Sequence, residues 1–141
     1  MRTIPRITIL IRLVILCLLP GCNPIKSTQS AQDAVVRFHT NLDKGAFKEI
    51  YTAAHPEFKK ASNEKSFTEL LGAIHRKLGA VSATERTNWN VNSFNMKTNV
   101  VLTYVTKFAE GEGTETFTYR IDGNKALLLG YNINSQDLIT K

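Results

Sequence analysis

Residues 100–121 read VVLTYVTKFAEGEGTETFTYRI, and the alternation of apolar and polar residues in this stretch decides the fold. A period of two is the pattern of a β-strand with one buried face. Two such runs lie on either side of the segment 110–113, whose two glycines suit a tight connection. The stretch therefore predicts two neighbouring strands. The residues that share one face are Val100, Leu102, Tyr104, Thr106 and Phe108 on the first strand and Glu115, Phe117, Tyr119 and Ile121 on the next.

The same period extends in both directions from this pair. Residues 81–93 and 127–133 also alternate, which predicts a first and a fourth strand. The Asp122-Gly123 pair is typical of a tight hairpin, which needs positive φ at its central residues. The turn at 93–98 has no glycine and depends on Asn95 for any positive φ, so the register there is the least firmly predicted. Strands this close in sequence pair as an antiparallel meander.

Residues 31–78 show helical spacing instead. Apolar residues recur three or four positions apart, and Gly45, Pro56 and Gly79 interrupt the pattern. We therefore expect three helices, over residues 31–45, 47–54 and 63–78. Helices first and strands last predict an α+β domain, in which the N-terminal helices pack on one face of a curved four-stranded antiparallel β-meander.

Residues 1–21 are predicted to be a lipoprotein signal peptide. Three arginines precede an apolar run that ends in Leu19-Pro20-Gly21-Cys22, and this is the order of a basic region, a short apolar region and a small-residue cleavage site. Cleavage would leave Cys22 first, where its thiol takes a lipid anchor. The apolar run is too short for a transmembrane helix, which needs about 20 residues. Because Pro20 is unusual in a lipobox, processing without lipidation stays open.

The cut divides the chain into a signal peptide (1–21), a lipidated cysteine with a flexible tether (22–30) and a single domain (31–141). The tether contains too few apolar groups to pack, and Ser30 is expected to cap the first helix. No disulfide is expected, since Cys17 leaves with the signal and Cys22 carries the lipid. Without the three arginines of the signal, 15 Lys and Arg face 12 Asp and Glu, a net charge of +3. That charge is too small and scattered to predict a nucleic-acid partner.

A set of positions spread over the domain carries a resemblance to a known family. They are Phe38-His39, Leu42-Asp43, Gly45, Ile50-Tyr51, Lys77-Leu78-Gly79, Trp89, Gly111, Gly113, Glu115, Phe117 and residues 130–135. In their order and spacing the chain resembles a bacterial lipoprotein family known as domain of unknown function 4019. The resemblance implies a nuclear-transport-factor-two-like or cystatin-like fold, with helices in the concave side of a bent antiparallel sheet. It implies no activity.

His39 and Asp43 are the candidate pair for acid–base chemistry. They lie four residues apart on the first predicted helix, where a carboxylate can orient an imidazole. The simpler interpretation is a histidine on the flank of the helix that bonds Asp43 or water. Glu110, Glu112 and Glu115 cluster around two glycines, but their spacing does not match a calcium loop, and Glu115 is expected to pair with a lysine or arginine across strands. No metal or cofactor is predicted.

Aromatic residues are the remaining candidates for function. Several fall on strand positions, and in a curved sheet they either form the core under the helices or line a shallow pocket. A sheet edge that accepts a peptide is another way for such a domain to bind a partner. The candidate ligand-binding residues are Trp89, Tyr104, Tyr119, Tyr131 and Asn132.

Together these features favour a membrane-anchored lipoprotein of the bacterial envelope with a non-catalytic binding domain. We expect its partner to be another envelope protein or a peptide. Asn23, rather than an aspartate, follows Cys22, which under enterobacterial sorting rules favours the outer membrane, facing the periplasm. The alternative is a small hydrolase or isomerase that uses His39 and Asp43 in a cone-shaped pocket.

Overall fold

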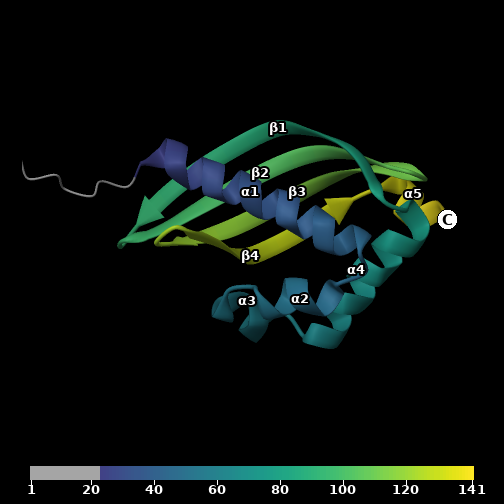
Figure 1. The fold of residues 1–141 in the computed structure, drawn as a ribbon, viewed down its shortest axis with the longest axis horizontal. Helices are drawn as coiled ribbons and strands as arrows, with labels where there is room; N and C mark the ends of the chain where they lie inside the picture. Colours follow the sequence, from purple (N-terminus) through teal and green to yellow (C-terminus); the bar gives the residue numbers. More distant parts are fainter. Residues whose placement is uncertain (1–22) are drawn as a thin grey trace, which may run out of the picture.

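One antiparallel sheet with the strand order β1-β2-β3-β4 forms a layer of the molecule (Figure 1). The computed structural model describes residues 23–141, so the predicted signal peptide and Cys22 lie outside the described residues. The meander predicted from the period of two is confirmed. The strands are β1 (Val81–Phe94), β2 (Lys97–Phe108), β3 (Gly111–Asp122) and β4 (Lys125–Asn134).

The hairpin turns and the register follow from local sequence. Asn95 and Met96 both have positive φ, 48° and 58°, which is the geometry of the two-residue turn that fits the twist of a hairpin. This turn places Val91 opposite Val100 and Trp89 opposite Leu102. A register shift between Arg86 and Asn88 interrupts the pairing, and such bulges bend a strand.

The helices lie on one side of the sheet, where α1 crosses the strands and α2, α3 and α4 pack beyond it (Figure 1). The prediction of an α+β domain, with N-terminal helices packed on a four-stranded antiparallel sheet, is therefore confirmed. Pro56 ends the second helical segment as expected, but it also occupies the first turn of α3, with His55 as its N-cap. The helices are α1 (Pro24–Asp43), α2 (Phe47–Thr52), α3 (Pro56–Ala61), α4 (Glu64–Leu78) and the short C-terminal α5 (Gln136–Thr140).

The flexible tether predicted for residues 22–30 is wrong for the part that the structure describes. Residues 24–30 form the first turns of α1, and its N-cap is Asn23 rather than Ser30. The Asn23 side chain accepts a hydrogen bond from the backbone N–H of Ile25 at 3.1 Å, and Pro24 suits the first helical position. Once the later turns of a helix are packed, further turns cost little to add, so a segment with few apolar residues can still be helical.

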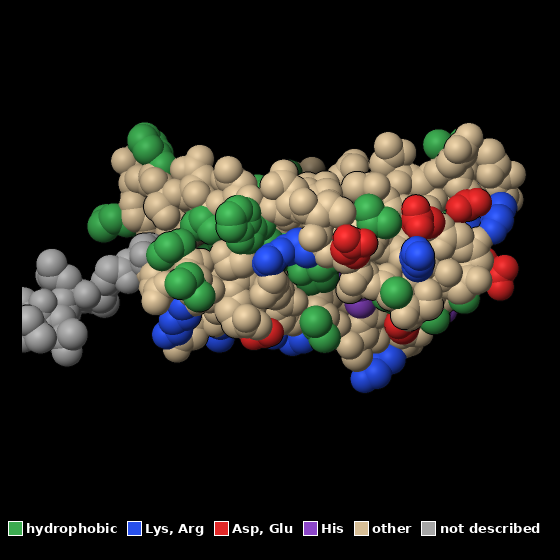
Figure 2. Space-filling view, turned by 90° about the horizontal axis from the view of Figure 1, so that it is seen from above, with side chains coloured by type: hydrophobic (Ala, Val, Ile, Leu, Met, Phe, Trp, Pro, Cys, Tyr) green, Lys and Arg blue, Asp and Glu red, His purple; other side chains and the backbone are tan. Residues whose placement is uncertain are grey.

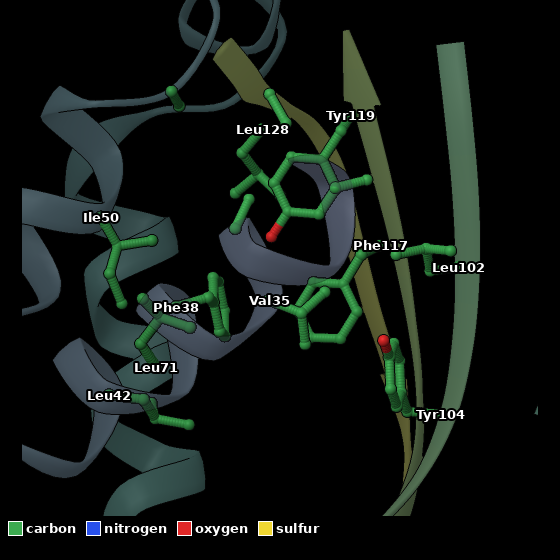
Figure 3. Packing of buried hydrophobic residues seen from close by; sticks show 14 of the residues in the cluster. Val35, Phe38, Leu42, Ile50, Leu71, Leu102, Tyr104, Phe117, Tyr119 and Leu128 are labelled. Carbon is green, nitrogen blue, oxygen red and sulfur yellow. The ribbon is translucent and has the colours of Figure 1, made fainter. Parts of the chain in front are cut away.

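The hydrophobic core fills the space between the helices and the sheet (Figure 3). Phe38 of α1 contacts Phe117 of β3 edge to face, with ring centroids 5.1 Å apart. Tyr104, Phe117 and Tyr119 are buried on the same face of the sheet. The interpretation of the strand aromatics as core is therefore confirmed for these residues, whereas the Trp89 side chain is 55% exposed.

Candidate functional site

An open groove of about 560 Å³ runs between the N-terminal half of α1 and the edge strand β1. One wall is helical, and the other is formed by residues of the strand. Apolar side chains of both walls lie at the surface here, and Ile25 is 79% exposed. The lining residues are Pro24, Ile25, Thr28, Gln29 and Gln32 of α1 and Arg86, Trp89, Asn90 and Val91 of β1.

Trp89 is oriented toward this groove by the register of the sheet. It is paired with Leu102, whose side chain is fully buried under the helices, and residues opposite each other in an antiparallel pair point to the same face. β1 lies at the edge of the sheet, and every residue of the strand is exposed or only partly buried. The indole therefore faces the helical layer but stays half uncovered.

The groove combines an apolar floor with neutral polar groups. Gln32 and Asn90 carry amides that both donate and accept hydrogen bonds, and Arg86 adds one positive charge. No carboxylate or histidine is among the lining residues. β1 has a single strand neighbour, so it presents an unpaired row of backbone N–H and C=O groups along this side. These features suit an extended chain with apolar side chains better than they suit acid–base chemistry.

A second group of polar residues lies closed inside the domain. The Glu115 carboxylate is fully buried and accepts hydrogen bonds from the hydroxyls of Thr106, at 2.5 Å, and Tyr131, at 2.7 Å. His39 of α1 is 2.7 Å away through Nε2. The His39 ring donates in this contact when its proton is on Nε2, because an ionised carboxylate can only accept. Burial and the neighbouring Glu115 raise the pKa of Tyr131 well above 10, which keeps its hydroxyl a donor.

This cluster differs from the predicted pairs. His39 binds Glu115 rather than Asp43, whose carboxylate instead accepts from the backbone N–H of Val81 at 3.0 Å. The prediction that Glu115 pairs with a lysine or arginine is also wrong, because its partners are His39, Thr106 and Tyr131. The signal that was missed is the position of Glu115 on the same strand parity as Phe117, since a carboxylate facing the core needs buried donors.

The other candidate residues are separated by the fold. Tyr104 is buried beside Phe117, and Tyr131 points inward to Glu115. Asn132 is exposed on β4 and is paired with Thr116, on the parity opposite to Tyr131. Of the five, only Trp89 lines the groove. Gln29 and Ile25 were missed because the helix was predicted to begin at Ala31, although their spacing to Gln32 already places them on one stripe.

Two further site types have no support among residues 23–141. No three side chains of His, Cys, Asp or Glu gather there in an arrangement that could hold a metal ion. Among the helices that the structure describes, none combines the length and apolar character needed to cross a bilayer.

The comparison with protein families agrees with the resemblance drawn from the sequence. A search of curated proteins found no significant match. A family model described as a protein of unknown function, DUF4019, matches residues 34–131, which include His39, Trp89 and Glu115 but not the first ten residues of α1. Because this match covers more than half of the sequence, the chain belongs to the DUF4019 family.

Proposed function

We propose that this protein is a lipid-anchored lipoprotein of the bacterial envelope whose domain binds an extended peptide segment of another envelope protein. The binding site is the groove between α1 and β1, and no reaction takes place there. The observation that carries the proposal is the half-exposed Trp89 in a groove that borders the free edge of the sheet.

The peptide would use two features of this edge. Its backbone pairs with the free N–H and C=O groups of β1, which is the common way for a sheet edge to accept an extended chain. An apolar side chain of the peptide then lies against Trp89 and Val91, and tryptophan is a frequent anchor of binding energy in such interfaces. Gln32 and Asn90 supply hydrogen bonds at the rim of the groove.

The proposed anchor at Cys22 is supported by what surrounds the start of α1. The described chain begins at Asn23, and the β1–β2 turn lies at the same end of the molecule (Figure 1). Phe94 and Met96 of this turn are 74% and 104% exposed, and Ile25 is also at the surface. Hydrophobic side chains gather at this end (Figure 2). Apolar residues beside a lipid anchor can rest in the membrane interface and hold the groove close to the bilayer. Under enterobacterial sorting rules, Asn23 next to Cys22 favours anchoring in the outer membrane.

The hydrolase or isomerase alternative has less support. Its histidine is bound to Glu115 in the interior, where the two side chains are 9% and 0% exposed, and neither residue lines the groove. A general acid or base has to reach the proton that it transfers. The cluster instead links α1 to β2, β3 and β4 through hydrogen bonds, which is a structural task.

The proposal is tested by photocrosslinking in cells. A benzophenone amino acid is placed at Gln29, which lines the groove, and at Thr40, which is exposed on the same helix outside it. We expect a protein adduct from position 29 and none from position 40, with the partner identified by mass spectrometry. The adduct should weaken in a Cys22→Ala variant. Equal adducts at both positions, or none at position 29, would contradict the groove as a binding site.

The anchor is tested separately by intact mass. Acyl chains on an N-terminal Cys22 are expected in the purified native protein. A mature chain that keeps residue 1, or one that begins at residue 22 without acyl groups, would overturn the lipid anchor without deciding whether the groove binds a peptide.

A further inference from the structure

The hydroxyl of Tyr119 is the starting point, because it is buried without a partner. The residue is 2% exposed, and its hydroxyl oxygen has no hydrogen-bond partner among residues 23–141. Nearly all buried polar side-chain atoms in folded proteins are hydrogen-bonded, so each exception needs an explanation. The phenol stays protonated, since burial raises the pKa of Tyr119 far above 10. Its hydroxyl is therefore a donor that lacks an acceptor.

The Tyr119 side chain lines a pocket that is distinct from the groove at Trp89. In Figure 3 the Tyr119 ring points away from the sheet toward the helices, between Leu128 and α1. The pocket has a volume of about 150 Å³, which corresponds to about five water-sized groups at about 30 Å³ each. Its lining residues are Ala34, Arg37, Phe38 and Asn41 of α1, Ile50 of α2, Ala53, Tyr119 of β3 and Ala126 and Leu128 of β4.

The polar groups of the pocket can all donate hydrogen bonds. Tyr119 carries a hydroxyl and Arg37 a permanent positive charge, and Asn41 adds an amide that both donates and accepts. Arg37 has no ion pair or hydrogen bond to its guanidinium within the part of the chain that the structure describes, and no carboxylate lines the pocket. The remaining walls are aliphatic or aromatic. The pocket therefore offers donors and a positive charge to an acceptor, and an apolar surface to what the acceptor is attached to.

We propose that this pocket binds a monocarboxylate with a short apolar chain. The carboxylate accepts hydrogen bonds from the Tyr119 hydroxyl and the Arg37 guanidinium, and the chain packs against Ile50, Ala126 and Leu128. About five non-hydrogen atoms fit inside, so the pocket holds the carboxylate and about two further carbons, and the rest of a longer chain extends out through the open side of the pocket. This site does not depend on the lipid anchor or on the peptide groove.

A direct test uses pentanoate as the probe and the full chain in detergent solution. Amide and side-chain NMR signals are followed during titration with pentanoate and, in parallel, with pentanol and pentylamine. We expect saturable shifts centred on Tyr119 and Leu128 with pentanoate, at least tenfold weaker binding of pentanol, and no binding of pentylamine. Equal responses to the three compounds, or shifts that map elsewhere, would overturn the proposal.

Variants separate the two polar contacts. Tyr119→Phe removes only an unpaired hydroxyl, so the fold should be kept, and pentanoate should bind at least fivefold more weakly. Arg37→Gln should abolish the preference for pentanoate over pentanol, whereas Arg76→Gln, exposed on α4 and outside both the pocket and the groove, is the matched control and should change nothing at this pocket. If pentanoate does not bind at tens of millimolar, the cavity holds water alone and the assignment fails.

Discussion

Replacing Glu115 with alanine should destabilise the domain more than any surface substitution, because it removes the acceptor shared by three buried side chains. The hydroxyls of Thr106 and Tyr131 and Nε2 of His39 would all lose their partner. A buried polar group left unsatisfied costs about 1–3 kcal/mol, and three buried side chains lose their partner here. Thr106 and His39 are 0% and 7% exposed, so bulk solvent does not reach these groups in the intact domain. We expect a loss of about 3–5 kcal/mol, against a total stability of about 5–15 kcal/mol for a domain.

Urea unfolding followed by far-ultraviolet circular dichroism measures this loss. The matched control is Glu112→Ala, which removes an exposed carboxylate from the same strand and should change the free energy of unfolding by less than about 0.5 kcal/mol. A loss below about 1 kcal/mol for Glu115→Ala would refute the reasoning, because it would mean that the three donors find other partners. An unchanged m-value is required for the comparison, since it shows that the surface exposed on unfolding is the same.

We attribute the loss of stability in Glu115→Ala to the broken hydrogen-bond network and not to the presence of a charge. Apolar groups that replace a whole buried polar cluster are often neutral or stabilising. A variant in which Glu115 and His39 are leucine, Thr106 is valine and Tyr131 is phenylalanine should therefore recover at least half of the stability lost in Glu115→Ala. A combined variant less stable than the single one would contradict this account, which depends on non-additivity among residues in contact.

Three further predictions concern the surface. Arg120, and more weakly Lys97, lower the pKa of the Glu57 carboxyl from 4.5. The stability that this gives is present above the pKa of the unfolded state and is lost as the pH falls through the lower pKa of the folded state. Glu57→Gln should therefore flatten the acid side of the plot of unfolding free energy against pH, and an unchanged acid side would argue against it. Trp89→Ala should remove the crosslinked adduct from position 29 and should change the free energy of unfolding by about 1 kcal/mol at most, because the indole is half exposed. An unfolded Trp89→Ala protein would instead show that the indole has a structural role. Asn23→Ala should speed amide exchange over residues 24–30 and cost about 1 kcal/mol, whereas Ser30→Ala should do neither.

What the sequence predicted well were features set by near neighbours. The alternation around Leu102 and Phe117 predicts two strands because side chains alternate between faces in any strand. Gly79 and Asn95 mark a helix end and a turn because few residues adopt positive φ without strain. In each case the cause lies within a few positions of the effect.

What could not be predicted depends on residues far apart in the chain. His39 and Glu115 are 76 positions apart, and their contact requires both the tilt of α1 and the register of β3. The nearer carboxylate of Asp43 looked like the partner because helical spacing is the one proximity that a sequence displays directly. The groove was missed for a related reason: one wall is a helix extension that local propensity did not favour, and the other is an edge strand whose exposure depends on where the sheet ends.

The buried cluster and the groove are connected through α1, which is one uninterrupted helix from Pro24 to Asp43. At about 1.5 Å per residue, Pro24 lies roughly 22 Å along the axis from His39, so a change of about 5° in the tilt of α1 at the cluster displaces its first turn by roughly 2 Å. That displacement is large compared with the tolerance of a packed interface. If the groove binds a peptide as proposed, the His39–Glu115 contact has a task in that binding, since it would hold the angle of α1 and with it the width of the groove at Trp89. Glu115→Gln, which keeps the size of the side chain, should for this reason weaken capture of the partner at position 29 although residue 115 does not touch the groove.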